Sequence, residues 1–305
     1  MAKKFPETLL EFEHWFRTEE ACRLYLAKLR WGGGFQCPRC GHRRAWLTSR
    51  GLYHCASCKA DTSVTAGTIF ERSRMPLRLW FRACWWITNQ KSGVTALGLQ
   101  RLLGLGSYET AWMCMHKLRR AMIRPGRERL TGDVEVDETL LGGVRKRPAS
   151  RYQKAVIGIA AEIRGKGIGR IRLKVLPNDL ENSIVTFVRH AVEPGAELFT
   201  DGAHAYKALV SHGYTHQRTI MQDIPRPKQS AALPRVHRVA SLLKRWLLGI
   251  YQGRVSRRQL DHYLGEFAFR FNRRTSEHRG MLFYRLLQQC VLLPPSPYRK
   301  IVGAS

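Results

Sequence analysis

Carboxylates are scarce in this chain, yet four of them fall within the segment 133–138. The whole chain has 23 Asp and Glu residues against 52 Lys and Arg. Within the segment the acids alternate with valines, and this period of two predicts a strand with Asp133, Glu135 and Asp137 on one face. We interpret the cluster, at a strand end, as a site that binds cations. The alternative interpretation is a solvated polar strand edge.

A second candidate ligand, Asp201, lies in another expected strand, 197–202. The expected order from the first strand onwards is strand, strand, strand, helix, strand, helix, strand. The other elements of this series are expected at 155–161, 168–175, 180–192, 204–212 and 214–220. This is the order of an RNase H-like domain, in which the ends of the first and fourth strands are neighbours. We therefore expect Asp137 and Asp201 to lie side by side.

A third ligand is expected from the helix 234–250, because two carboxylates alone hold a pair of divalent ions poorly. No Asp or Glu occurs between Asp223 and Asp261, so His237 is the strongest ligand available on that helix. Lys244 follows seven residues later on the same face and suits a phosphate oxygen. The alternative is a surface histidine on a basic DNA-binding face. Three glutamates are alternative third ligands: Glu135, Glu138 and Glu266.

Two Cys-x-x-Cys pairs, Cys37 with Cys40 and Cys55 with Cys58, predict a zinc ribbon near the N-terminus. A unit this small has little core, so bound Zn²⁺ would supply its folding free energy. A redox dithiol pair is the alternative function. His42 and His54 are alternative ligands, although four thiolates suffice. The other cysteines are expected to be buried thiols: Cys22, Cys84, Cys114 and Cys290.

Between the ribbon and the acidic strand, the sequence predicts two helices, 93–103 and 108–122, around a Gly-containing turn. This pattern matches a helix-turn-helix, and an ordinary helical hairpin is the alternative. Basic residues of the second helix favour DNA contact: His116, Lys117, Arg119 and Arg120. The last expected helix is 257–272, and residues 291–305 are expected to form a loose tail.

Composition limits the partners. The formal net charge is +29, which indicates a polyanionic partner, most simply nucleic acid. No apolar run is long enough to span a membrane and no signal sequence is present, so we expect a cytoplasmic, nucleoid-associated protein. The expected fold is α+β and multidomain: helices plus ribbon (1–70), a helix-turn-helix-like domain (71–130), an RNase H-like mixed sheet with flanking helices (131–290) and a tail (291–305).

The order of the motifs resembles that of bacterial insertion-sequence transposases of the zinc-ribbon DDE group, the ISXO type, and of their eukaryotic relatives, the Merlin transposases. The resemblance covers nearly the whole chain. It is carried by Glu20-Ala-Cys-Arg23, Leu29-Arg-Trp31, Cys37-Pro-Arg-Cys40-Gly41, Ser63-Val-Thr-Ala-Gly-Thr-Ile69, Val134-Glu-Val-Asp-Glu-Thr139, Gly142-Gly143, Thr200-Asp-Gly202, Tyr206, Leu243-Lys-Arg245, Gly249 and Glu266-Phe-Ala-Phe-Arg-Phe-Asn-Arg273.

The resemblance implies that Asp137 and Asp201 are the first two catalytic carboxylates. The third catalytic residue of the family stands seven before a lysine, here Lys244, which places His237 where many members have Glu. The implied activity is cleavage of DNA at element ends and strand transfer into target DNA, with two Mg²⁺ or Mn²⁺ ions and a structural Zn²⁺. An imidazole ligand would favour Mn²⁺ over Mg²⁺. A homodimer or larger assembly on DNA is expected.

Two other functions remain open at this point. One is a zinc-ribbon DNA-binding regulator whose active site has decayed, which would bind DNA specifically without cleaving it. The other is a structure-selective nuclease on the same fold, which would cut DNA without joining it. His237 in place of Glu keeps the first of these alternatives open.

Overall fold

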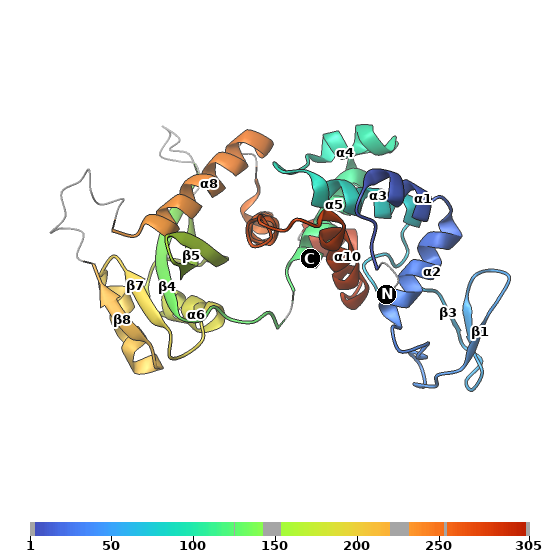
Figure 1. Ribbon diagram of the computed structural model, residues 1–305, viewed down its shortest axis with the longest axis horizontal. Coiled ribbons are helices and arrows are strands. Elements are labelled where there is room, and N and C mark those ends of the chain that lie inside the picture. The colour runs from blue at the N-terminus through green and yellow to red at the C-terminus, as the bar shows by residue number, and fades with distance from the viewer. Residues whose placement is uncertain (1–3, 125, 143–153, 220–231, 253–254, 303–305) are drawn as a thin grey trace. The chain divides into compact units, whose positions relative to one another are not determined.

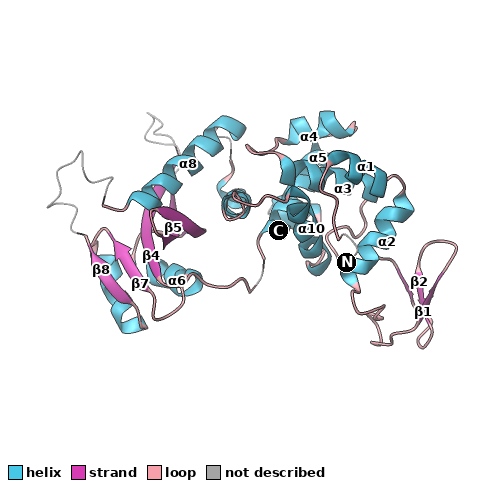
Figure 2. Ribbon diagram, in the orientation of Figure 1, coloured by secondary structure: helices cyan, strands magenta, loops and turns pink. Residues whose placement is uncertain are grey.

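The computed structural model describes residues 4–124, 126–142, 154–219, 232–252 and 255–302. The chain divides into two compact units, Met1–Arg124 with Ser276–Ser305, and Pro125–Thr275. The second unit therefore ends at Thr275 rather than at residue 290. Among the described residues, no helix combines the length and apolar character needed to cross a membrane. Figure 1 labels the elements, and Figure 2 colours them by type.

Helices build the first unit. They are α1 (Leu9–Trp15), α2 (Glu19–Arg30), α3 (Leu77–Asn89), α4 (Ala96–Leu103), α5 (Tyr108–Met122), α10 (Arg279–Leu292) and α11 (Tyr298–Val302). Thr18 caps α2 by accepting the backbone N–H of Ala21 at 3.1 Å, as expected for a threonine before two glutamates. The four cysteines outside the ribbon are all buried, as predicted.

The C-terminal segment belongs to this helical unit. The ring centroid of Phe283 on α10 lies 5.4 Å from that of Phe12, 5.8 Å from Phe81 and 5.7 Å from Trp85. The expectation that helix 257–272 is the last one is therefore wrong. The expectation of a loose tail at 291–305 is also wrong, because that segment contains α11 and the buried Ile301. The apolar face of α10 is buried against N-terminal helices, which makes it part of their core.

The two helices around a Gly turn are present as α4 and α5, and Gly104 takes the left-handed conformation (φ 63°) between them. However, His116 is 0% exposed and Arg119 is 3% exposed. The prediction that these two side chains favour DNA contact is wrong, because α5 is packed against α3, α4 and α10. The helix-turn-helix function of the pair stays a prediction.

The ribbon is a small antiparallel sheet of β1 (Ala45–Leu47), β2 (Tyr53–Cys55) and β3 (Asp61–Thr62), in that order. Trp46 lies opposite His54 in the hairpin, and their rings are 4.5 Å apart. The tight hairpin between the Cys-x-x-Cys pairs is as predicted. These short strands bury few side chains, consistent with a unit that depends on bound metal.

A mixed five-stranded sheet forms the centre of the second unit, with strand order β6-β5-β4-β7-β8. The strands are β4 (Asp133–Leu141), β5 (Ala155–Arg164), β6 (Gly167–Leu176), β7 (Glu197–Thr200) and β8 (Thr215–Arg218). The first three form an antiparallel meander, as predicted. β4 and β7, and β7 and β8, run parallel.

Helices cover both faces of this sheet (Figure 1). On one face lie α6 (Glu181–Ala191) and the 3₁₀ segment η1 (His204–His212), which share a core with Val134 and Val136 of β4. On the other lie α8 (Pro234–Tyr251) and α9 (Leu260–Phe271), the latter preceded by η3 (Arg257–Gln259). Because side chains alternate along β4, Glu135 and Asp137 project towards the α8 face.

Candidate active site and metal centre

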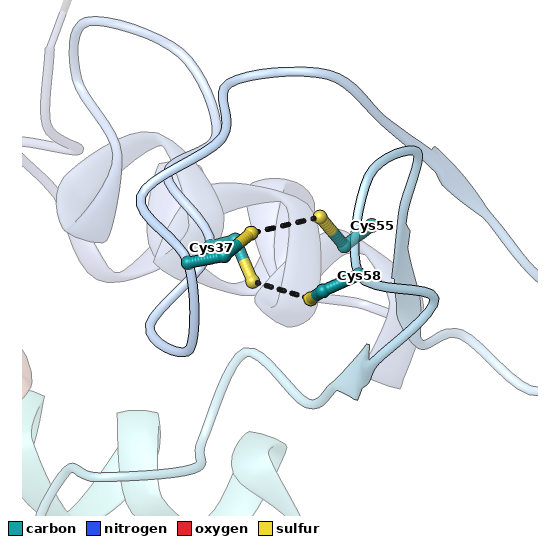
Figure 3. Close-up of side chains that lie close together, drawn as sticks. Cys37, Cys55 and Cys58 are labelled. Carbon is teal, nitrogen blue, oxygen red and sulfur yellow. Dashed lines mark hydrogen bonds between the residues drawn. The ribbon is translucent and has the colours of Figure 1, made fainter.

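The four ribbon cysteines form one cluster, and Figure 3 labels three of them, Cys37, Cys55 and Cys58. The four sulfur atoms all lie within 4.8 Å of one another. Cys37 Sγ is 3.6 Å from Cys58 Sγ, and Cys40 Sγ is 3.6 Å from Cys55 Sγ. Four thiolates at this spacing fit a tetrahedral Zn²⁺. The ligand set predicted from the sequence is therefore assembled by cysteines alone.

The turns of the ribbon favour the thiolate form of Cys37 and Cys55, whereas burial and the neighbouring cysteines raise the pKa of Cys58 to about 11. Burial raises the pKa of Cys55, but the backbone N–H groups of Cys58 and Ser57 donate to its sulfur and bring the pKa down to about 6. Hydrogen bonds of the same kind lower the pKa of Cys37 against the effect of burial. His54 is engaged elsewhere, because its Nδ1 lies 2.8 Å from Asp61 Oδ1.

Asp137 and His237 meet, although they are 100 residues apart in sequence. His237 Nε2 lies 3.3 Å from Asp137 Oδ2. Asp137 extends from β4, and His237 lies in the first turn of α8. The imidazole is about one-third exposed and the carboxylate mostly buried, so the pair is open on one side.

Asp201 directly follows β7, at the level of Asp137 in the neighbouring central strand β4. β4 and β7 are parallel neighbours in which Asp133 lies opposite Glu197, and the two aspartates each follow that pair by four residues. Asp201 Oδ1 accepts the N–H of Ala203 at 3.0 Å. Gly202, at φ 79°, turns the chain here, and an added Cβ would lie 3.3 Å from a backbone oxygen of Thr219.

Burial and a neighbouring carboxylate dominate the electrostatics of Asp137. Burial raises its pKa, and the nearby Asp201 carboxylate raises it further. The Glu138 N–H, 2.8 Å from Asp137 Oδ1, and His237 oppose this rise. The resulting pKa is about 6. A bound cation would favour the ionised form.

Glu138 lies within the same strand, three residues before its end, so the acid cluster is not at a strand end as expected. Its side chain interacts with Tyr206 on η1. Burial raises the Glu138 pKa to about 7, while the Tyr206 hydroxyl lowers it. Among the described residues, neither Glu138 Oε1 nor the Tyr206 hydroxyl has a hydrogen-bond partner of ordinary geometry. Strand alternation directs Glu138 away from the α8 face, so it is not a neighbour of His237.

The other glutamates considered as third ligands are engaged in other contacts. Glu135 is 2% exposed and forms a 2.9 Å ion pair with Arg235. Glu266 is 1% exposed and pairs with Arg270 at 2.8 Å within α9. Lys244 is exposed two turns beyond His237 on α8, about 10 Å along the helix axis. The contacts of Glu135 were not foreseen from the sequence.

The two candidate metal sites differ in closure. Among the residues that the structure describes, one group of three or more potential ligands lies close enough to bind a single ion, and it consists of the four cysteines. Asp137, Asp201 and His237 are neighbours in a looser arrangement. The structure thus defines a zinc-ribbon protein with a mixed α+β domain in which Asp137 of the central strand contacts His237 and interacts with Asp201.

Comparison with known families agrees with that class. Residues 17–61 match the transposase zinc-ribbon domain, and residues 129–272 match the ISXO2-like transposase domain. The chain therefore belongs to the zinc-ribbon insertion-sequence transposases, which confirms the resemblance recognised in its motifs. Membership of these families implies that the protein binds DNA and is associated with transposition.

A relative supports this assignment. Over 277 residues the chain is 25% identical to an uncharacterized protein in the transposable element ISH50 of Halobacterium salinarum. The match covers 84% of this chain and 91% of the relative. No solved structure matches the chain.

Proposed function

We propose that the protein is a divalent-metal-dependent transposase that cleaves DNA at the ends of an insertion sequence and joins them to target DNA. Asp137, Asp201 and His237 form the proposed active site. The observation that carries this proposal is the 3.3 Å contact between His237 Nε2 and Asp137 Oδ2, beside Asp201, in a chain of the transposase family.

The fold of the second unit supports an RNase H-like assignment. An antiparallel meander continues into two parallel strands, and helices cover both faces. In this topology the end of the fourth strand adjoins the middle of the first, where Asp137 lies. That arrangement accounts for why Asp137 and Asp201 interact although 64 residues separate them.

The ligand set suits a pair of divalent cations. Bound ions would activate water or a 3′-hydroxyl and stabilise the leaving oxygen of the phosphodiester. Asp137, Asp201 and His237 would hold the ions, with Asp137 in contact with His237 and close to Asp201. An imidazole adds no negative charge and is softer than a carboxylate, so we expect Mn²⁺ to support activity better than Mg²⁺.

The remaining charges fit a DNA substrate. Lys244 is exposed beyond His237 on the same helix face, where it would hold a phosphate oxygen near the metal pair. The chain's net charge of +29 favours phosphate contacts throughout. Because transposition brings two ends together, we propose a homodimer or larger assembly that acts at the nucleoid.

Substitution of the three proposed ligands tests the site. We expect Asp137→Ala, Asp201→Ala and His237→Ala each to lower the rate of strand cleavage by about a thousandfold, since loss of metal-ion stabilisation costs several kcal/mol. Cleavage and joining are measured with end-containing oligonucleotides, plasmid DNA and Mn²⁺. Asp133→Ala, four residues earlier on the same strand, and His190→Ala, on α6, are matched controls that should retain activity.

Each outcome separates one function from the others. Full activity of His237→Ala would remove that residue from the site. Specific DNA binding without cleavage by the wild-type protein would favour the regulator. Cleavage without strand transfer would favour a structure-selective nuclease.

A further inference from the structure

Helix α8, which carries His237, begins without a cap of its own. Its N-cap residue is Leu233, which offers no side-chain acceptor, and its first turn holds no acidic residue. Pro234 at the first helical position lacks an N–H, but Arg235 and Val236 leave theirs without partners inside the helix. A helix end of this kind needs an acceptor from elsewhere in the fold.

Glu135 of β4 supplies that acceptor. Its Oε2 accepts the backbone N–H of Arg235 at 2.7 Å and that of Val236 at 2.9 Å. Its Oε1 accepts from Nη1 of Arg235 at 2.9 Å. The carboxylate is 2% exposed, so these bonds are made away from water. A buried negative charge also complements the positive end of the helix dipole.

Arg235 extends the contact to a third element. Its Nη2 donates to the carbonyl of Gly165 at 2.7 Å, and its Nε donates to that of Gly167 at 3.1 Å. Both carbonyls lie at the turn between β5 and β6. The guanidinium thus ties β4 and the β5–β6 turn to the start of α8, which fixes the helix in rotation and along its axis.

The residues of this contact adjoin the proposed ligands in both segments. Glu135 precedes Asp137 by two residues and shares its face of β4. Arg235 and Val236 immediately precede His237. Since Glu135 binds the helix start in one register, the first turn of α8 brings the imidazole of His237 to the Asp137 carboxylate.

We propose that Glu135 is a positioning residue that holds His237 against Asp137 by anchoring the N-terminus of α8. The inference rests on the proposed function, because it assigns a part in building the same metal site. It also assigns Glu135 a role other than that of metal ligand. Its carboxylate is engaged by two backbone N–H groups and a guanidinium, and it is shielded from solvent.

The test compares Glu135→Gln with Glu162→Gln in the full-length protein. Glu162 makes similar contacts, accepting the backbone N–H of Arg170 at 2.8 Å and its Nη2 at 2.7 Å, but its partner lies on β6 rather than α8. We expect Glu135→Gln to weaken binding of Mn²⁺ by ten- to a hundredfold, as for residues that orient a ligand, and Glu162→Gln to leave it unchanged. Titration calorimetry on the zinc-loaded protein measures the affinity.

A second readout needs neither metal nor activity. In the wild-type background, Asp137→Asn should shift the NMR signals of the His237 ring, because the two side chains are in contact. In the Glu135→Gln background the same substitution should shift them far less. Unchanged Mn²⁺ affinity together with an unchanged shift in Glu135→Gln would overturn the proposal.

Arg235→Lys serves if Glu135→Gln does not fold. Lysine lacks the planar fork with which Arg235 bonds Glu135 and two carbonyls. We therefore expect Arg235→Lys to reduce the Mn²⁺ affinity and the shift of the His237 ring, but less than Glu135→Gln does. No reduction in either would overturn the proposal. Failure of the proposed function is recognised separately. In that case Asp137→Ala would not reduce the Mn²⁺ binding of the protein. The NMR shifts of the His237 ring would still decide whether Glu135 positions His237.

Discussion

The ribbon and the second site, formed by Asp137, Asp201 and His237, obtain their candidate ligands in opposite ways. The ribbon takes four sulfur atoms from two short turns, and they lie within 4.8 Å of one another. The second site takes one side chain from each of three elements of a large domain, and Asp137 and His237 are in contact at 3.3 Å. The ribbon sulfurs surround one point, as in structural zinc sites, whereas the His237 imidazole of the second site is about one-third exposed.

The difference extends to what holds each site together. The ribbon strands bury little, so the metal is the main source of order there. Asp137, Asp201 and His237 are held by a five-stranded sheet with helices on both faces. We therefore expect loss of metal to unfold the first site and to leave the second one assembled.

Among the substitutions considered, loss of a zinc ligand should have the largest effect on folding. We expect Cys55→Ser to abolish zinc binding and to unfold residues 37–62, because zinc contributes about 10 kcal/mol or more to such units. The sheet of the second unit should keep its protection against amide hydrogen exchange. Ser57→Ala, in the same turn but not a ligand, is the matched control. A full equivalent of zinc in Cys55→Ser would show that the ribbon is not closed by four thiolates.

The closed site was predictable from the sequence because its ligands are local. The spacing of Cys37, Cys40, Cys55 and Cys58 defines the ribbon without any knowledge of the rest of the fold. The strand that carries Asp137 was predictable as well, since its alternation is a local signal. The strand expected at 197–202 is present but ends at Thr200, so Asp201 follows it. The adjacency of Asp137 and Asp201 required a fold assignment in addition.

Long-range packing was not predictable. The contact of Glu135 with α8 joins residues 100 apart in sequence, and no spacing rule connects them. The start of α8 did offer a signal, since it lacks a capping side chain. The charges of α5 suggested an exposed helix, but packing within the helical unit buries His116 and Arg119. The apolar stripe of α10 was visible in the sequence, whereas its partner helices were not.

A smaller effect on stability is expected when the charge of Asp137 in the second site is removed. In the protein free of Mg²⁺ and Mn²⁺, the folded-state pKa of Asp137 is about 6, against 3.8 for an ordinary aspartate. Between these values the folded state binds more protons than the unfolded state, so stability falls as pH rises towards 6 and stays reduced above it. We expect Asp137→Asn to avoid this loss and to stabilise the sheet domain at pH 8 by about 1 to 3 kcal/mol.

The measurement uses amide hydrogen exchange of β5, comparing variant with wild type at pH 4 and again at pH 8. Near pH 4 the Asp137 carboxyl is largely protonated in the folded state, so the gain should shrink markedly. Asp133→Asn, at the exposed start of the same strand, should show little change at either pH. An equal gain at both pH values would contradict the charge-based explanation and indicate a packing effect.

The smallest effect on the free energy of unfolding is expected at Tyr206 on η1, next to Glu138. Its fully buried hydroxyl lacks a hydrogen-bond partner of ordinary geometry among the described residues, so Tyr206→Phe should change the free energy of unfolding by less than about 1 kcal/mol. Tyr214→Phe is the matched control and should cost more, because the Tyr214 hydroxyl donates to the Val192 carbonyl at 3.0 Å. Tyr206→Phe should also raise the pKa of Glu138, which the hydroxyl lowers, and carboxyl ¹³C NMR measures that pKa. A larger loss of stability in Tyr206→Phe than in Tyr214→Phe would mean that the Tyr206 hydroxyl is a structural support of the open site.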